Sequence, residues 1–182
     1  RVIQTMNLDQ YKHNINGAIV IYEHPPALIP NPTYRKSLYK IVYDPVKDDN
    51  GGTSLASVLV YKGLSENWNA GIQDGIVAEY IGRYDKVDDM HDLVLKIAHY
   101  YNATVLVENN IPGFINYCKI NGYVHKLQIS PYEAISKGMV TFSRKYDYGV
   151  TMSKQLNTHC EQLIRQWLLE PWKKEDDRLL LN

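Results

Sequence analysis

The chain contains few cysteines, few phenylalanines and no excess of charge of either sign. Its 182 residues include only 2 Cys and 2 Phe, and 20 Lys and Arg balance 20 Asp and Glu. Two cysteines are too few for a disulfide framework or a cysteine-built zinc site, so we expect a reduced, intracellular protein. Zero net charge argues against coating nucleic acid by bulk charge, but it leaves a local basic groove open.

Membrane and motor signals are also missing. No apolar run reaches transmembrane length, no secretory signal precedes the first expected strand, and no Gly-rich loop ends in Gly-Lys-Ser/Thr. The chain starts at Arg1 and ends just after the apolar run 179–181, without a helix stop signal. We therefore expect the chain to be a fragment of a longer polypeptide. We expect the fragment itself to have no membrane partner, and it contains no ATPase motif.

The pattern of apolar residues divides the chain into two parts. Residues 1–37 are interpreted as an N-terminal connector or arm, with a short strand at 17–22 and a proline-rich stretch at 24–32. Three β-rich runs joined by turn-rich loops predict an antiparallel meander: residues 38–44, 55–61 and 75–81. The remaining elements are expected in this order: helix 87–101, strand 103–108, short helix 112–118, strand 123–129, β-hairpin 139–151 and helix 152–167, capped by Thr151 or Ser153.

Two of the apolar runs end in an acid, Asp44 and Glu108. A strand, a helix and a second strand in one sheet imply a parallel return, and the economical arrangement places residues 103–108 beside residues 38–44. Both carboxylates then lie at the same edge of the sheet, where oxygen ligands suit a divalent metal ion. Taken singly, an Asp before Pro45 is a common way to end a strand, and Glu108 could be a salt-bridged strand end.

The ordered set of these segments carries a resemblance. Its segments are residues 39–45, 51–56, 77–83, 100–109 and 148–151. In this order they resemble the ribonuclease H-like fold and, more closely, the C-terminal nuclease domain of the large terminase subunit of tailed bacteriophages. The resemblance implies an α/β fold, a ribonuclease H-like mixed five-stranded sheet flanked by helices with an extra β-hairpin, over residues 38–182, truncated at the C-terminal end.

The family implies an endonuclease that depends on Mg²⁺ or Mn²⁺ and cuts concatemeric double-stranded DNA. Three acids hold two metal ions in such enzymes; Asp44 matches the first and Glu108 the second. The third is not matched, and we expect it beyond Asn182; the candidates within the chain are Glu161, Glu175, Asp176 and Asp177. The implied partners are an ATPase domain on the same polypeptide, the portal and the small terminase subunit, in the cytoplasm of the host cell.

Other residues and functions stay open. Arg144 and Lys145 on the expected hairpin can grip a DNA backbone, or they belong to an ordinary polar hairpin tip. Four histidines share no ligand spacing and are interpreted as core or surface residues: His91, His99, His125 and His159. The alternatives are another ribonuclease H-like nuclease of the resolvase or transposase type, and a non-catalytic domain that docks on DNA or the portal.

Overall fold

The centre of the protein is an open, five-stranded mixed β-sheet. The computed structural model describes residues 19–25, 38–46, 54–64, 71–110, 112–131 and 147–169. The strand order is β1-β4-β3-β2-β5, and only the β2–β5 pair is parallel. The strands are β1 (Ile19–Ile21), β2 (Tyr39–Asp44), β3 (Ala56–Lys62), β4 (Gly75–Gly82) and β5 (Thr104–Val107). The predicted α/β class, the meander and the parallel return beside residues 38–44 are confirmed.

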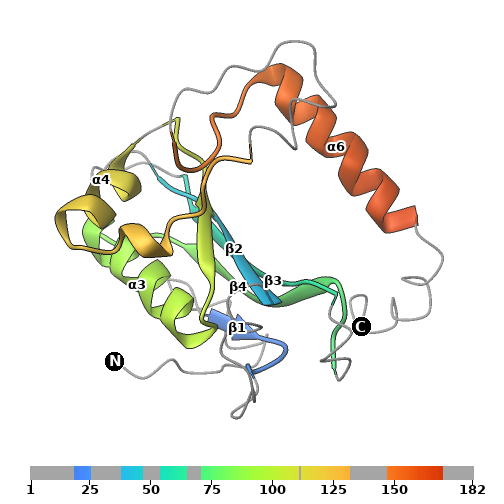
Figure 1. Ribbon diagram of the computed structural model, residues 1–182, viewed down its shortest axis with the longest axis horizontal. Helices are drawn as coiled ribbons and strands as arrows, with labels where there is room; N and C mark the ends of the chain where they lie inside the picture. The colour runs from blue at the N-terminus through green and yellow to red at the C-terminus, as the bar shows by residue number, and fades with distance from the viewer. Residues whose placement is uncertain are drawn as a thin grey trace.

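Helices lie on both sides of this sheet. The helices are α3 (Val87–Tyr100), α4 (Gly113–Ile120) and α6 (Lys154–Leu169), with a short 3-10 helix, η1 (Val124–Lys126). Figure 1 shows the sheet nearly edge-on, with α3 and α4 on one side and α6 on the other. Within the described residues, no helix is long and apolar enough to cross a membrane.

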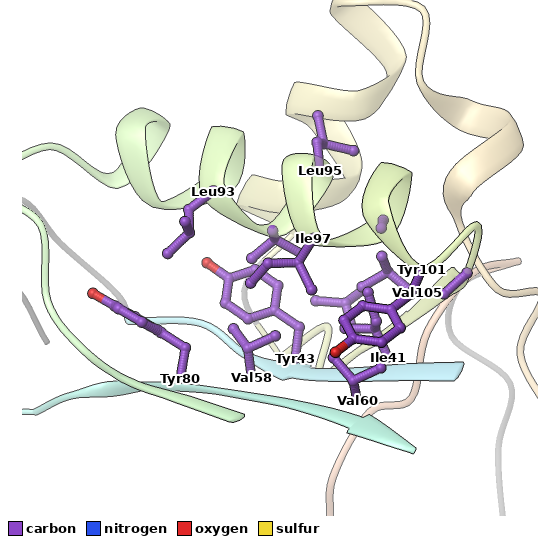
Figure 2. Close-up of a cluster of buried hydrophobic side chains, with 14 of the residues drawn as sticks. Ile41, Tyr43, Val58, Val60, Tyr80, Leu93, Leu95, Ile97, Tyr101 and Val105 are labelled. Atoms are coloured by element: carbon purple, nitrogen blue, oxygen red, sulfur yellow. The ribbon is translucent and has the colours of Figure 1, made fainter. Parts of the chain in front are cut away.

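The core lies between α3 and one face of the sheet. Successive side chains of a strand point to opposite faces, so Ile41 and Tyr43 of β2 and Val58 of β3 are buried toward α3, together with Ile97 of that helix (Figure 2). Full burial of side chains of this size contributes roughly 1.5–3 kcal/mol each. Tyrosine replaces the scarce phenylalanine here; for example, the Tyr43 hydroxyl lies 3.1 Å from His91 Nδ1.

The opposite face of the sheet carries the other set of alternating residues. Along β2 these are Lys40, Val42 and Asp44, and Val42 is 45% exposed. The register places Ser57 of β3 beside Asp44. We call this surface the open face; in Figure 1 it is turned toward α6.

A buried ion pair fixes the N-terminal edge of the sheet. Glu23 Oε1 lies 2.6 Å from Nζ of Lys62, whose side chain is completely buried, and the hydroxyl of Tyr101 donates to the Glu23 carbonyl oxygen at 2.8 Å. The backbone N–H of Ile72 donates to the other carboxylate oxygen of Glu23. Residues 19–25 therefore belong to the same sheet and core as the later strands.

The predicted strand at 123–129 is wrong. The N–H groups of Lys126 and Leu127 donate to Tyr123 and Val124, forming η1, and only Leu127 and Ile129 make isolated bridges. The chain turns locally because the stem of Lys126 is buried and its Nζ donates to the Ala98 carbonyl oxygen at 3.2 Å. The fifth strand of the sheet is β1 instead, and residues 139–146 of the predicted hairpin lie outside the described part of the chain.

Candidate metal centre at the ends of β2 and β5

The parallel pairing of β2 and β5 brings the two predicted acids together. Tyr43 is in register with Val107, and the N–H of Glu108 donates to the Tyr43 carbonyl oxygen at 2.9 Å. Asp44 and Glu108 are thus the next residues of two adjacent strands, both on the open face. The main-chain ladder, rather than a flexible loop, places the two carboxyl groups side by side.

The electrostatics of this pair show how close the two groups are. Partial burial raises the pKa of Glu108 first, and the negative charge of Asp44 and a side-chain hydrogen bond to Asp44 raise this pKa further. Two carboxylates this close repel each other unless a proton or a cation lies between them. Neither acid forms an ion pair with a Lys, Arg or His within the described ranges.

The two asparagines that follow Glu108 support it in different ways. Asn110 is exposed, and its Nδ2 donates to Glu108 Oε1 at 2.8 Å, which orients that carboxylate. Asn109 is 1% exposed; its Nδ2 donates to the Tyr148 carbonyl oxygen, and its Oδ1 accepts a 2.6 Å hydrogen bond from Thr151. Asn109 therefore ties the end of β5 to the segment that leads into α6.

The segment 147–151 continues the sheet next to Glu108. Val150 N–H donates to the Val107 carbonyl oxygen at 2.9 Å, and Asn109 N–H donates to the Val150 carbonyl oxygen at the same distance. Gly149 has a φ of 72°, and a Cβ there would lie 2.9 Å from Val107 Cγ1. Only glycine lets the backbone approach β5 this closely in this conformation.

The start of α6 is set by the same segment. The hydroxyl oxygen of Ser153 accepts a 3.2 Å hydrogen bond from the N–H of Leu156, so Ser153, one of the two predicted caps, is the residue that caps the helix. At the other end, Nε1 of Trp167 donates to Asp74 at 3.2 Å. Leu156 is fully buried, whereas Leu163 and Ile164 are 50% and 56% exposed.

Of the residues predicted to act, the structure brings together Asp44 and Glu108. Glu161 is exposed on α6, and the described residues contain no group of three or more His, Cys, Asp and Glu that could hold a metal ion. Arg144, Lys145, Glu175, Asp176 and Asp177 lie outside the described residues. His91 is buried against aromatic rings of the core and His99 and His125 are exposed, which is consistent with their interpretation as core or surface residues.

Sequence reasoning missed the supporting asparagines and the lysine of the open face. The amide pair directly after a strand-ending acid was a usable signal for Asn109 and Asn110, because amide side chains can orient a carboxylate and cap a strand end. Lys40 occupies the alternate, non-core position of an otherwise apolar strand, which also marks it in the sequence.

The residues present suit a divalent cation. Adjacent carboxylate oxygens, one of them oriented by an amide, are the ligand type that Mg²⁺ and Mn²⁺ prefer. The absence of a basic partner in the described part of the chain leaves this negative charge for a cation to balance.

Neither a protein-family model nor a curated protein matches the sequence.

Proposed function

We propose that this chain is the ribonuclease H-like nuclease domain of a tailed-bacteriophage terminase large subunit, an endonuclease that depends on Mg²⁺ or Mn²⁺. The observation that carries the proposal is the pairing of Asp44 with Glu108 at the same edge of two adjacent parallel strands, without a basic partner among the described residues. The raised pKa of Glu108 supports this proposal, because partial burial and the nearby charge of Asp44 make its negative charge unfavourable unless a cation balances it.

The arrangement of elements supports the same proposal. An antiparallel meander, a helix and a parallel return to the first strand of the meander occur in the chain order of a ribonuclease H-like domain. The sheet positions Asp44 through β2 and Glu108 through β5, so neither acid depends on loop geometry. Many activities share one fold, so the paired acids support this function more directly than the fold does.

In the proposed site, the two acids and the two asparagines have different roles. Asp44 and Glu108 bind the divalent ions through carboxylate oxygens, and Asn110 holds Glu108 in one orientation. The bound ions supply the activation of water and the stabilisation of negative charge on the leaving oxygen of a phosphodiester. Asn109 keeps the segment 147–151 against β5, which closes the edge of the sheet beside the acids.

The proposal includes a third acid from outside the described residues. Mg²⁺ favours near-octahedral oxygen ligation, which two carboxylates only begin to supply. The substrate is concatemeric double-stranded DNA, and the proposed partners are an ATPase domain on the same polypeptide, the portal and the small terminase subunit. The proposed place of action is the cytoplasm of the infected host cell.

Cleavage of supercoiled plasmid tests this function. The 182-residue chain is incubated with Mn²⁺ or Mg²⁺ beside Asp44→Asn and Glu108→Gln, with Glu161→Gln as a matched control on α6. Nicking or linearisation that needs the metal, vanishes in the first two variants and persists in the control is the expected result. Cleavage that is unchanged by Asp44→Asn and Glu108→Gln would overturn the proposal.

A non-catalytic docking domain is the second candidate. It is favoured by the lack of a third acid near Asp44 and Glu108 in the described ranges. DNA binding without any divalent-ion binding at Asp44 would support docking. Preference for branched DNA over linear duplex in the cleavage assay would instead indicate a resolvase-type nuclease.

A further inference from the structure

Among the residues that the structure describes, one lysine shares the open face with the two acids. Lys40 and Asp44 lie on the same face of β2, with Val42 between them. Thr104 of β5 is the neighbour of Lys40 in register. Along a strand, four residues span about 13 Å at ~3.3 Å per residue. Val42 lies between the two and is 45% exposed, so the face is accessible along this stretch.

The ammonium group of Lys40 is half-buried, and its partners within the described ranges are neutral. Its Nζ donates to Gln128 Oε1 at 3.1 Å and to Thr104 Oγ1 at 3.2 Å. The hydroxyl of Thr104 also lies 2.8 Å from Gln128 Oε1, so the two acceptors form one connected group. No carboxylate of the described residues forms an ion pair with Lys40.

Two other lysines of the same protein pair with carboxylates. Lys62 is buried against Glu23, and the exposed Lys96 pairs with Asp92 at 3.1 Å. A cation that loses part of its hydration without an opposite charge costs free energy. An ammonium group has three donors, and the two observed acceptors leave one for another group.

We propose that Lys40, held by Thr104 and Gln128, is a binding subsite for a phosphate of the DNA strand that lies across the open face. The inference depends on the proposed function, because that function places the cleaved phosphodiester at Asp44 and Glu108. A distance of about 13 Å places this phosphate within a few nucleotides of the cleaved bond on the same strand. Lys40 supplies the positive charge, and its two neutral partners fix the amine without neutralising it.

DNA binding in EDTA tests the subsite separately from cleavage. The 182-residue chain is titrated against a fluorescein-labelled linear duplex over a series of KCl concentrations. Lys40→Met removes the charge, Lys40→Arg retains it, and Lys119→Met is the matched control, since Lys119 is exposed on α4 on the other side of the sheet. We expect Lys40→Met to weaken binding about tenfold at low salt and to reduce the slope of log K against log salt by about 0.9.

A second variant keeps the test valid if Lys40→Met does not fold. Gln128→Glu places a carboxylate where Oε1 now accepts from Lys40, so the amine stays in place but is neutralised. It is expected to weaken DNA binding at least as much as Lys40→Met, whereas Lys40→Arg and Lys119→Met stay within about twofold of the original chain.

The outcomes separate this inference from the proposed function. Equal affinity and salt slope for Lys40→Met, Gln128→Glu and the original chain would overturn the phosphate subsite even if Asp44→Asn abolishes cleavage. Weaker binding in these two variants with no metal-dependent cleavage in any chain would support the subsite and reject the nuclease. A chain that does not bind duplex DNA at low salt would overturn the subsite.

Discussion

The backbone N–H of Glu108 donates a 2.9 Å hydrogen bond to the carbonyl oxygen of Tyr43. Because Tyr43 precedes Asp44, this one bond sets the two acids at the same level of adjacent parallel strands. A shift of register by one residue would turn one carboxylate into the core. The proposed metal centre is thus a consequence of strand register.

Divalent-ion binding should follow the acid pair. We expect Asp44→Asn and Glu108→Gln each to weaken Mn²⁺ binding more than tenfold, because each removes a proposed metal ligand. Asn110→Ala, which releases Glu108 Oε1, should weaken it by about tenfold, as is usual for partners that orient a metal ligand. Isothermal titration calorimetry measures these changes, and Glu161→Gln should leave the affinity unchanged. Equal affinity in all four variants would exclude the site.

Stability in the absence of metal should depend on pH through Glu108. Its pKa is raised above the ordinary value of 4.5 in the folded protein. The folded state therefore binds the proton of the Glu108 carboxyl group more tightly than the unfolded state does. The resulting stabilisation is present below pH 4.5 and is lost as the pH rises through the pKa of the folded protein. We expect Glu108→Gln to gain stability relative to the original chain between about pH 4 and about pH 7.

Urea unfolding in EDTA across this pH range, for the original chain and for Glu108→Gln, measures this difference in stability. Added Mg²⁺ should reverse the order at neutral pH, because it stabilises only the chain that binds it. A stability difference that is constant with pH would contradict the raised pKa.

The buried side chain of Asn109 should be important for stability. Asn109→Ala removes the partner of the Tyr148 carbonyl oxygen and of the Thr151 hydroxyl in a partly buried contact. We expect a loss of about 2–3 kcal/mol in the free energy of unfolding. Asn110→Ala, at an exposed position, is the control and should cost under about 1 kcal/mol; equal effects would contradict the assigned contacts.

The ion pair of Glu23 with Lys62 should hold β1 on the sheet. Glu23→Gln removes the carboxylate that lies against a fully buried ammonium group, which typically costs about 3–5 kcal/mol. Adding Lys62→Met removes the buried ammonium group as well, so the double variant should be more stable than Glu23→Gln alone. A double-mutant cycle from thermal or urea unfolding measures the coupling. Additive effects would show that Glu23 and Lys62 do not stabilise the fold through each other.

Local patterns were sufficient for most of the elements. Alternating apolar residues predicted β2, β3 and β4, and helical spacing predicted α3, because each period directly reflects which side chains face a core. They failed at 123–129, where Lys126 buries its stem and bonds the Ala98 carbonyl oxygen, a contact between distant segments. The role of Glu23 was missed for the same reason, since its partner Lys62 is on another strand.

The sequence by itself determined that two apolar strands end in acids, because alternation and strand ends are local properties. The parallel return of the chain also predicted that both acids lie at one edge of the sheet. Only the tertiary structure showed the register that pairs Tyr43 with Val107, and the contacts of Lys40 with Thr104 and Gln128 on the same face. Such pairings depend on register between strands far apart in the chain. The register between strands is fixed because one face of the whole sheet is buried against α3. This burial depends on the complete fold, so no short segment of the sequence determines it.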